Sequence, residues 1–74
     1  MQLLFPNPTR NLINIKHPKE VIIERTEMWS MDGQLMRQDL KCNPIGLGGY
    51  SAGLYWLQMF TNKGLKTVKL LKIE

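Results

Sequence analysis

Histidine and cysteine, which often serve as catalytic base and nucleophile, are rare in this sequence. No spacing in the chain is typical of a catalytic dyad or triad. The chain of 74 residues has one histidine, His17, and one cysteine, Cys42. A nucleophilic Ser–His–Asp or Cys–His arrangement would need His17 as its base and a further side chain to orient the imidazole. His17 instead adjoins Pro18 at the end of a predicted strand, where a solvated loop residue is expected. The sequence therefore predicts no catalytic residue.

Metal and redox chemistry are not predicted either. A structural zinc ion takes about four Cys, His or carboxylate ligands, and one Cys with one His cannot supply the usual set. An activated thiol needs a neighbouring base or a helix N-terminus, and the sequence places neither beside Cys42. The single cysteine also has no partner within the chain for a disulfide. We expect no metal, no cofactor and a plain small side chain at Cys42.

The glycine-rich stretch from Gly46 to Gly53 could suggest a phosphate-binding loop. A Gly-x-Gly-x-x-Gly loop that starts at Gly46 would need glycine at position 51, where Ser51 stands. A helix should also follow such a loop, whereas residues 54–60 have the pattern of a strand. Gly53 is explained more simply as a residue with an unusual φ angle just before a core strand. Nucleotide binding is therefore not predicted.

Length and composition predict one small folded domain that spans residues 1–74. A chain of this size buries roughly 60–65% of the surface that its unfolded form exposes, so the core is expected to be thin. With 43% hydrophobic and 22% charged residues, the composition is not that of a disordered tail. No apolar run reaches the roughly 18 residues of a membrane helix. Pro6 and Pro8 also interrupt the first apolar stretch too early for a signal peptide.

The elements expected to position these residues are strands. Turn signals divide the chain into segments of about 5–14 residues, which is typical of a small all-β sandwich. Residues Leu12–Lys16 alternate in the manner of a strand, with Ile13 and Ile15 on one face. Residues 54–60 alternate as well. Their predicted core face consists of Tyr55, Leu57 and Met59, and the tyrosine hydroxyl is expected to reach a polar partner.

Three turns are expected to connect the strands. Pro6, Asn7 and Pro8 predict a chain reversal, because the two prolines fix φ and the asparagine side chain can close an Asx turn. Asp32-Gly33 predicts the hairpin turn between residues 28–31 and Leu35–Leu40. Residues 61–64 predict another hairpin, with a positive φ at its glycine, followed by a last strand over residues 65–73.

Two segments have patterns that also suit a helix. Residues 19–31 follow Pro18 and contain glutamates that favour helices, and Gly33 could end such a helix. Residues 66–73 also have the pattern of a short basic amphipathic helix. Strands are favoured in both places, although the periodicity alone leaves the alternatives open.

Three segments, taken in order, resemble a known family. Leu4-Phe5-Pro6-Asn7-Pro8-Thr9 followed by residues 12–15 is similar to the opening "Y/F-P-N-P-(T/A)…-L-x-I" of the type A C-terminal sorting domains of the type IX (Por) secretion system. Residues 28–35 are similar to that family's "I-Y-D-L-x-G-K-L". Residues 47–57 resemble "L-S-x-L-x-x-G-x-Y-x-L", and residues 69–72 resemble its basic ending "K-K-L-I-I-K".

This resemblance implies a fold, a function and a set of partners. The fold would be a small immunoglobulin-like sandwich of about seven short antiparallel strands. The domain would be the C-terminal tail of a larger exported protein, and it would direct this passenger through the periplasm and the type IX outer-membrane translocon to the cell surface or the medium. A sortase-like surface protease would then remove it. The domain itself would be no enzyme. The residues expected to carry recognition or the shape of the motifs are Pro6, Asn7, Pro8, Gly33, Gly53, Tyr55, Lys69 and Lys72.

The charge distribution suggests an alternative function. The formal net charge is +4, and the lysines of the last twelve residues supply most of it. A small basic β-module could bind nucleic acid or a glycan with Trp56 and Phe60 on the outer face of their strand. In a terminal strand, however, Lys66 and Lys72 project to one face and Lys69 to the other, which divides the basic patch. We therefore expect no nucleic-acid partner, and lysines that either protect a sheet edge or dock on the translocon.

Overall fold

The computed structural model describes residues 3–5, 8–40 and 44–73. Within these ranges the chain forms strands and turns and no helix. The strands are β1 (Leu3–Phe5), β2 (Leu12–Lys16), β3 (Ile23–Ser30), β4 (Leu35–Leu40), β5 (Ile45–Gly46), β6 (Gly53–Thr61) and β7 (Gly64–Lys72). The predicted all-β class is confirmed.

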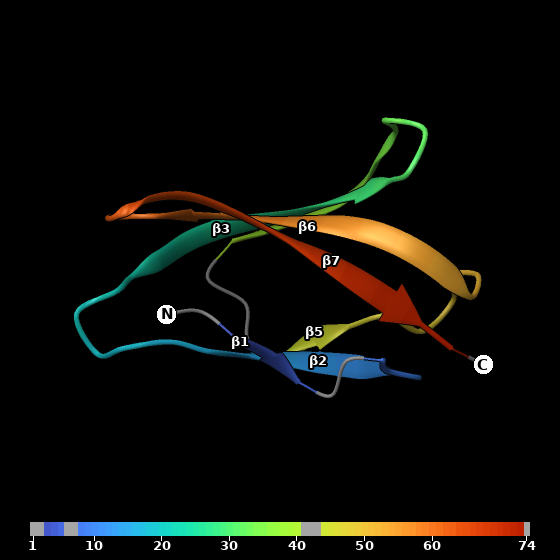
Figure 1. The fold of residues 1–74 in the computed structure, drawn as a ribbon, viewed down its shortest axis with the longest axis horizontal. Helices are drawn as coiled ribbons and strands as arrows, with labels where there is room; N and C mark the ends of the chain where they lie inside the picture. The colour runs from blue at the N-terminus through green and yellow to red at the C-terminus, as the bar shows by residue number, and fades with distance from the viewer. Residues whose placement is uncertain (1–2, 6–7, 41–43, 74) are drawn as a thin grey trace.

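The strands form two antiparallel sheets that face each other. The smaller sheet has the order β1-β2-β5, and the larger sheet has the order β4-β3-β6-β7. Figure 1 shows the two sheets as separate layers, with β7 along the near edge of the larger sheet. The expected sandwich is therefore present, and β6 lies in its larger sheet between β3 and β7.

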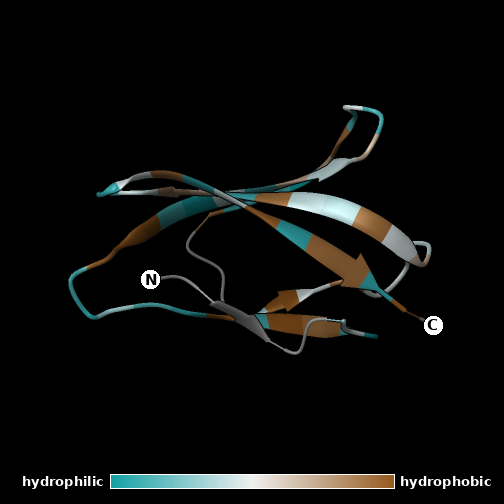
Figure 2. Cartoon of the chain, viewed as in Figure 1, coloured by the Kyte–Doolittle hydropathy of each residue, from teal (hydrophilic) through white to brown (hydrophobic). Residues whose placement is uncertain are grey.

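The core lies between the two sheets and follows the predicted alternation. Tyr55, Leu57 and Met59 on β6 are buried, as expected from their spacing. Ile13 and Ile15 on β2 are also buried, and they contribute the side chains of the smaller sheet to the core. Figure 2 shows bands of hydrophobic and hydrophilic residues along β6 and β7, and on β6 the buried positions alternate with less buried ones. The thin core thus consists largely of one face from each sheet.

The predicted hairpin turns are confirmed. In the β3–β4 turn, the backbone amide of Ser30 donates to the carbonyl of Gln34 at 2.8 Å. Gly33 in this turn has a φ of 92°, which side chains with a Cβ atom rarely adopt. In the β6–β7 turn Gly64 also has a positive φ, and the hydroxyl of Thr61 donates to its carbonyl at 2.7 Å.

Both ambiguous segments are strands, so the helical alternatives are wrong. Within residues 19–31 the regular element is β3, and its pairing is irregular between Ile23 and Arg25 and again between Met28 and Trp29. The irregularities disturb the alternation that marks a strand, which explains the ambiguous pattern. Residues 66–73 contribute to β7, whose register with β6 is continuous from Thr61↔Gly64 to Gly53↔Lys72.

Candidate functional site

The structure gathers several of the predicted site residues at one end of the sandwich. Gly53 pairs with Lys72, and Tyr55 pairs with Leu70 on the neighbouring strand β7. Pro8 is exposed and directly precedes Thr9, which forms a parallel bridge with Lys72. Two further predicted residues, Pro6 and Asn7, lie outside the described residues.

Thr9 joins the segment before β2 to the end of β7. Its backbone amide donates to the carbonyl of Leu71 at 3.0 Å, and its carbonyl accepts from the amide of Ile73 at 2.7 Å. Its hydroxyl donates to the carbonyl of Leu12 at 2.6 Å, and the residue is only 2% exposed. We call these bonds of Thr9 with Leu71 and Ile73 the Thr9 clasp. The clasp connects the smaller sheet with the last strand of the larger one.

Gly53 and Tyr55 shape the start of β6. Gly53 has a φ of 153°, which confirms the unusual backbone angle expected there. Two residues later, Tyr55 is 7% exposed, and its hydroxyl donates to the carbonyl of Ser51 at 2.6 Å. The hydroxyl thereby holds the loop before β6 against the strand. This agrees with the expectation of a core aromatic residue whose hydroxyl has a polar partner.

A Tyr55→Phe variant is expected to lose about 1 kcal/mol of stability, because it leaves the Ser51 carbonyl without this donor while keeping the aromatic ring in the core. Urea unfolding followed by tryptophan fluorescence measures this loss. Tyr50→Phe is a suitable control, since the hydroxyl of Tyr50 is 3.4 Å from its acceptor and a smaller effect is expected. Equal stability of Tyr55→Phe and the natural chain would contradict a structural role for the Ser51 contact.

The two terminal lysines differ in their surroundings. Lys69 is exposed on the outer face of the larger sheet, with its ammonium group 5.5 Å from the centre of the Trp56 ring. Lys72 is only 8% exposed and lies beside Thr9. Of the two predicted recognition lysines, Lys69 therefore presents its charge to solvent much more than Lys72 does.

Gly33, another predicted motif residue, lies in the β3–β4 turn. Its positive φ sets the shape of that turn.

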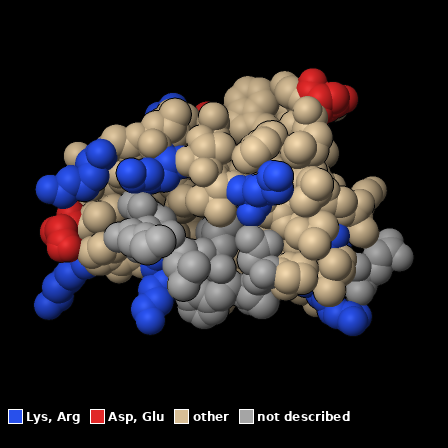
Figure 3. All heavy atoms as spheres, viewed as in Figure 1, with Lys and Arg blue, Asp and Glu red and all other residues tan. Residues whose placement is uncertain are grey.

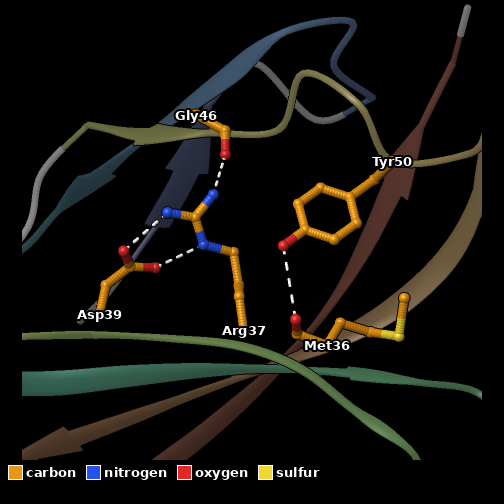
Figure 4. Close-up of polar contacts among 5 residues, drawn as sticks. All are labelled: Met36, Arg37, Asp39, Gly46 and Tyr50. Atoms are coloured by element: carbon orange, nitrogen blue, oxygen red, sulfur yellow. Dashed lines mark hydrogen bonds and ion pairs between the residues drawn. The ribbon is translucent and has the colours of Figure 1, made fainter.

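A polar bridge links the two sheets near β5 (Figure 4). The guanidinium of Arg37 on β4 donates to both carboxylate oxygens of Asp39 at 2.7 Å and to the carbonyl of Gly46 on β5. Close by, the hydroxyl of Tyr50 donates to the carbonyl of Met36. Because two parallel bonds fix the plane of the guanidinium, the third bond sets the position of β5 relative to β4.

Comparison with known proteins places the chain in a family. A family model described as a secretion system C-terminal sorting domain matches residues 3–74. The chain belongs to this family. No curated protein and no solved structure shows a significant match to it. The resemblance inferred from the motifs is therefore confirmed over nearly the whole chain.

Membership of this family gives the general function. These domains are the C-terminal sorting signals of the type IX secretion system, and they act as secretion tags rather than as enzymes. A sorting domain implies a passenger protein, the type IX machinery and export to the cell surface or the medium. In the described part of the chain, no helix has the length and hydrophobicity that crossing a membrane requires.

Sequence reasoning missed two contacts of the sorting domain. The Thr9 clasp joins residues more than sixty positions apart, and no local pattern reports such a pairing. The Arg37–Asp39 pair had a readable signal, because opposite charges two positions apart on a strand project to the same face. Among the described residues, no three His, Cys, Asp or Glu side chains come together as a metal site.

The outer aromatic residues of the sorting domain are partly covered by its own cations. The guanidinium of Arg25 lies 3.7 Å from the centre of the Phe60 ring. Trp56 is approached in the same way by Lys69, at a longer distance. Each cation occupies one face of its ring and is held there by the ring's negative electrostatic potential. These cations occupy part of the ring surface on which a base or sugar would stack in the alternative function.

Proposed function

We propose that this domain directs a passenger protein, attached upstream, through the type IX translocon of the outer membrane. The route leads through the periplasm to the cell surface or the medium, and a sortase-like surface protease then removes the domain. The observation that supports this most strongly is the extent of the family match, because residues 3–74 include every strand described here. A signal of this extent is a folded shape and not a short linear tag.

The residues expected from the motifs have two kinds of role in this proposal. Gly33, Gly53 and Tyr55 set the shape, since the glycines adopt positive φ angles and the tyrosine is buried. Lys72 belongs with them because it is largely buried beside Thr9. The recognition contacts are assigned to the first turn, at Pro6, Asn7 and Pro8, and to the exposed Lys69. Residues 1–74 act as a single domain at the end of a larger exported protein.

A reporter fusion tests the proposal. The fusion carries an N-terminal signal for export to the periplasm, a stable reporter and then residues 1–74, and it is expressed in a bacterium with a working type IX system. We expect the reporter on the cell surface or in the medium, without residues 1–74 once the protease has acted. In a translocon-deficient strain the reporter should stay in the periplasm. The same reporter without residues 1–74 is the control, and equal export of both would contradict the proposal.

A further inference from the structure

The last strand, β7, is an edge of the larger sheet with part of its backbone facing outward. Successive residues of an antiparallel strand direct their backbone groups alternately toward the neighbouring strand and away from it. The Thr9 clasp uses the carbonyl of Leu71 and the amide of Ile73, so the odd-numbered residues face away from β6. Leu65 and Thr67 belong to this outward series. Within the described ranges, the outward backbone groups of these two residues have no hydrogen-bond partner.

The two edges of the larger sheet differ in regularity. At the opposite edge, the pairing of β4 with β3 shifts register next to Trp29. The carbonyl of Met36 on β4 also accepts a bond from the hydroxyl of Tyr50. In contrast, β7 pairs with β6 through nine consecutive residues without a register shift. An edge strand with a continuous register is a suitable template for another strand, whereas a shifted and partly occupied edge is less suitable.

The charge of this edge selects the kind of strand that can pair with it. Between Gly64 and Lys72 there are three lysines and no acidic residue. Lys66 and Lys69 are both exposed, and they project to opposite faces of the sheet. Figure 3, which views the molecule from the side along which β7 runs, shows Lys and Arg spread over the surface and Asp and Glu near its margins. Such an edge repels a second copy of itself and attracts an acidic strand.

We propose that the outward edge of β7 at Leu65 and Thr67 binds an extended acidic segment of a partner protein as an added β-strand. The backbone groups of Leu65 and Thr67 supply the hydrogen bonds. Lys66 and Lys69 select carboxylates spaced three residues apart, because residues opposite these two lysines lie three positions apart in the partner strand. This inference rests on the proposed function, since the export machinery is the partner that a sorting domain must contact.

A labelled peptide tests the inference in solution. The probe is a fluorescent peptide of about nine alternating Val and Thr residues with two Glu placed three positions apart. We expect its fluorescence anisotropy to rise with the concentration of the folded chain of residues 1–74. The affinity should fall when salt increases from about 50 to about 300 mM. A peptide with Lys in place of Glu, and one with N-methylated backbone amides, should both bind at least tenfold more weakly.

Two variants locate the binding site on β7. Lys66→Glu combined with Lys69→Glu should weaken binding about tenfold, because two attractive cross-strand pairs become repulsive. Thr67→Pro removes an outward amide without removing a hydrogen bond to β6. This variant should abolish binding of the peptide. The control for charge is Lys16→Glu combined with Lys19→Glu, two exposed lysines outside β7, which should bind as the natural chain does. Circular dichroism checks that every variant is folded.

Several outcomes would overturn the inference. It fails if the β7 variants bind the acidic peptide as well as the natural chain does, or if the Lys or N-methylated peptides bind equally. It also fails if ultracentrifugation shows that the edge pairs with a second copy and Thr67→Pro abolishes that pairing. The reporter assay separates this failure from that of the proposed function. Export that depends on residues 1–74 but is unchanged by both β7 variants would overturn the edge site alone.

Discussion

A Leu57→Ala variant is expected to lose 2–5 kcal/mol of stability, as is usual when leucine is replaced by alanine in a core. Leu57 lies at the middle of β6, is 1% exposed and belongs to the hydrophobic cluster of buried residues between the sheets. A domain of this length has a free energy of unfolding of roughly 4–11 kcal/mol. The substitution therefore removes a large part of the free energy of unfolding, and the urea midpoint is expected to fall in proportion.

Urea unfolding measures this loss, and the chain offers a matched control. Leu54 lies on the same strand but projects to the outer face, where it is 41% exposed. Leu54→Ala is expected to cost less than about 1 kcal/mol, because little apolar surface is removed from a buried environment. Similar losses for the two variants would contradict the assignment of the core to the inner face of β6.

Deletion of residues 70–74 is expected to abolish cooperative unfolding. The deletion removes Leu70, which is fully buried, and the backbone of Leu71 and Ile73, which forms the Thr9 clasp. The core thus loses one of its larger side chains, and the connection between the smaller sheet and β7 is lost at the same time. A domain with a thin core has a small free energy of unfolding. The two losses together are therefore expected to exceed the free energy of unfolding of the complete domain.

Near-ultraviolet circular dichroism and thermal unfolding test this deletion. The truncated chain should lack the aromatic signal of fixed tertiary packing and show no sharp transition. Leu71→Ala is the control, since its side chain is 37% exposed and the backbone bond to Thr9 is kept. A truncated chain that still unfolds cooperatively would show that the end of β7 is dispensable for the fold.

Local patterns were sufficient to predict the strands that alternate regularly. On β6, burial follows every second residue from Tyr55 to Met59, and two-residue periodicity identifies such a face directly. For β3 the pattern was ambiguous, because the glutamates of residues 19–31 favour helices and the strand is irregular near both ends. Pairing with β6 along most of its length decides in favour of the strand, and the local sequence does not contain that information.

The candidate site could be predicted only where its residues act locally. Gly53 and Tyr55 act within a few positions of themselves, through a backbone angle and a bond to Ser51, so their roles could be predicted. Lys72 was expected to present a charge for docking. It is only 8% exposed, because β7 ends at Lys72 and this residue lies beside Thr9. The burial of Lys72 follows from the meeting of distant segments, which no spacing rule describes.

The central claim is that the folded domain is the export signal, and one measurement tests it most directly. The measurement is the fraction of a reporter found outside the cell when its C-terminal domain is complete or lacks residues 70–74, in a bacterium with a working type IX system. We predict that the complete domain exports most of the reporter and that the truncated domain leaves it in the periplasm. Equal export of the two fusions would contradict the claim.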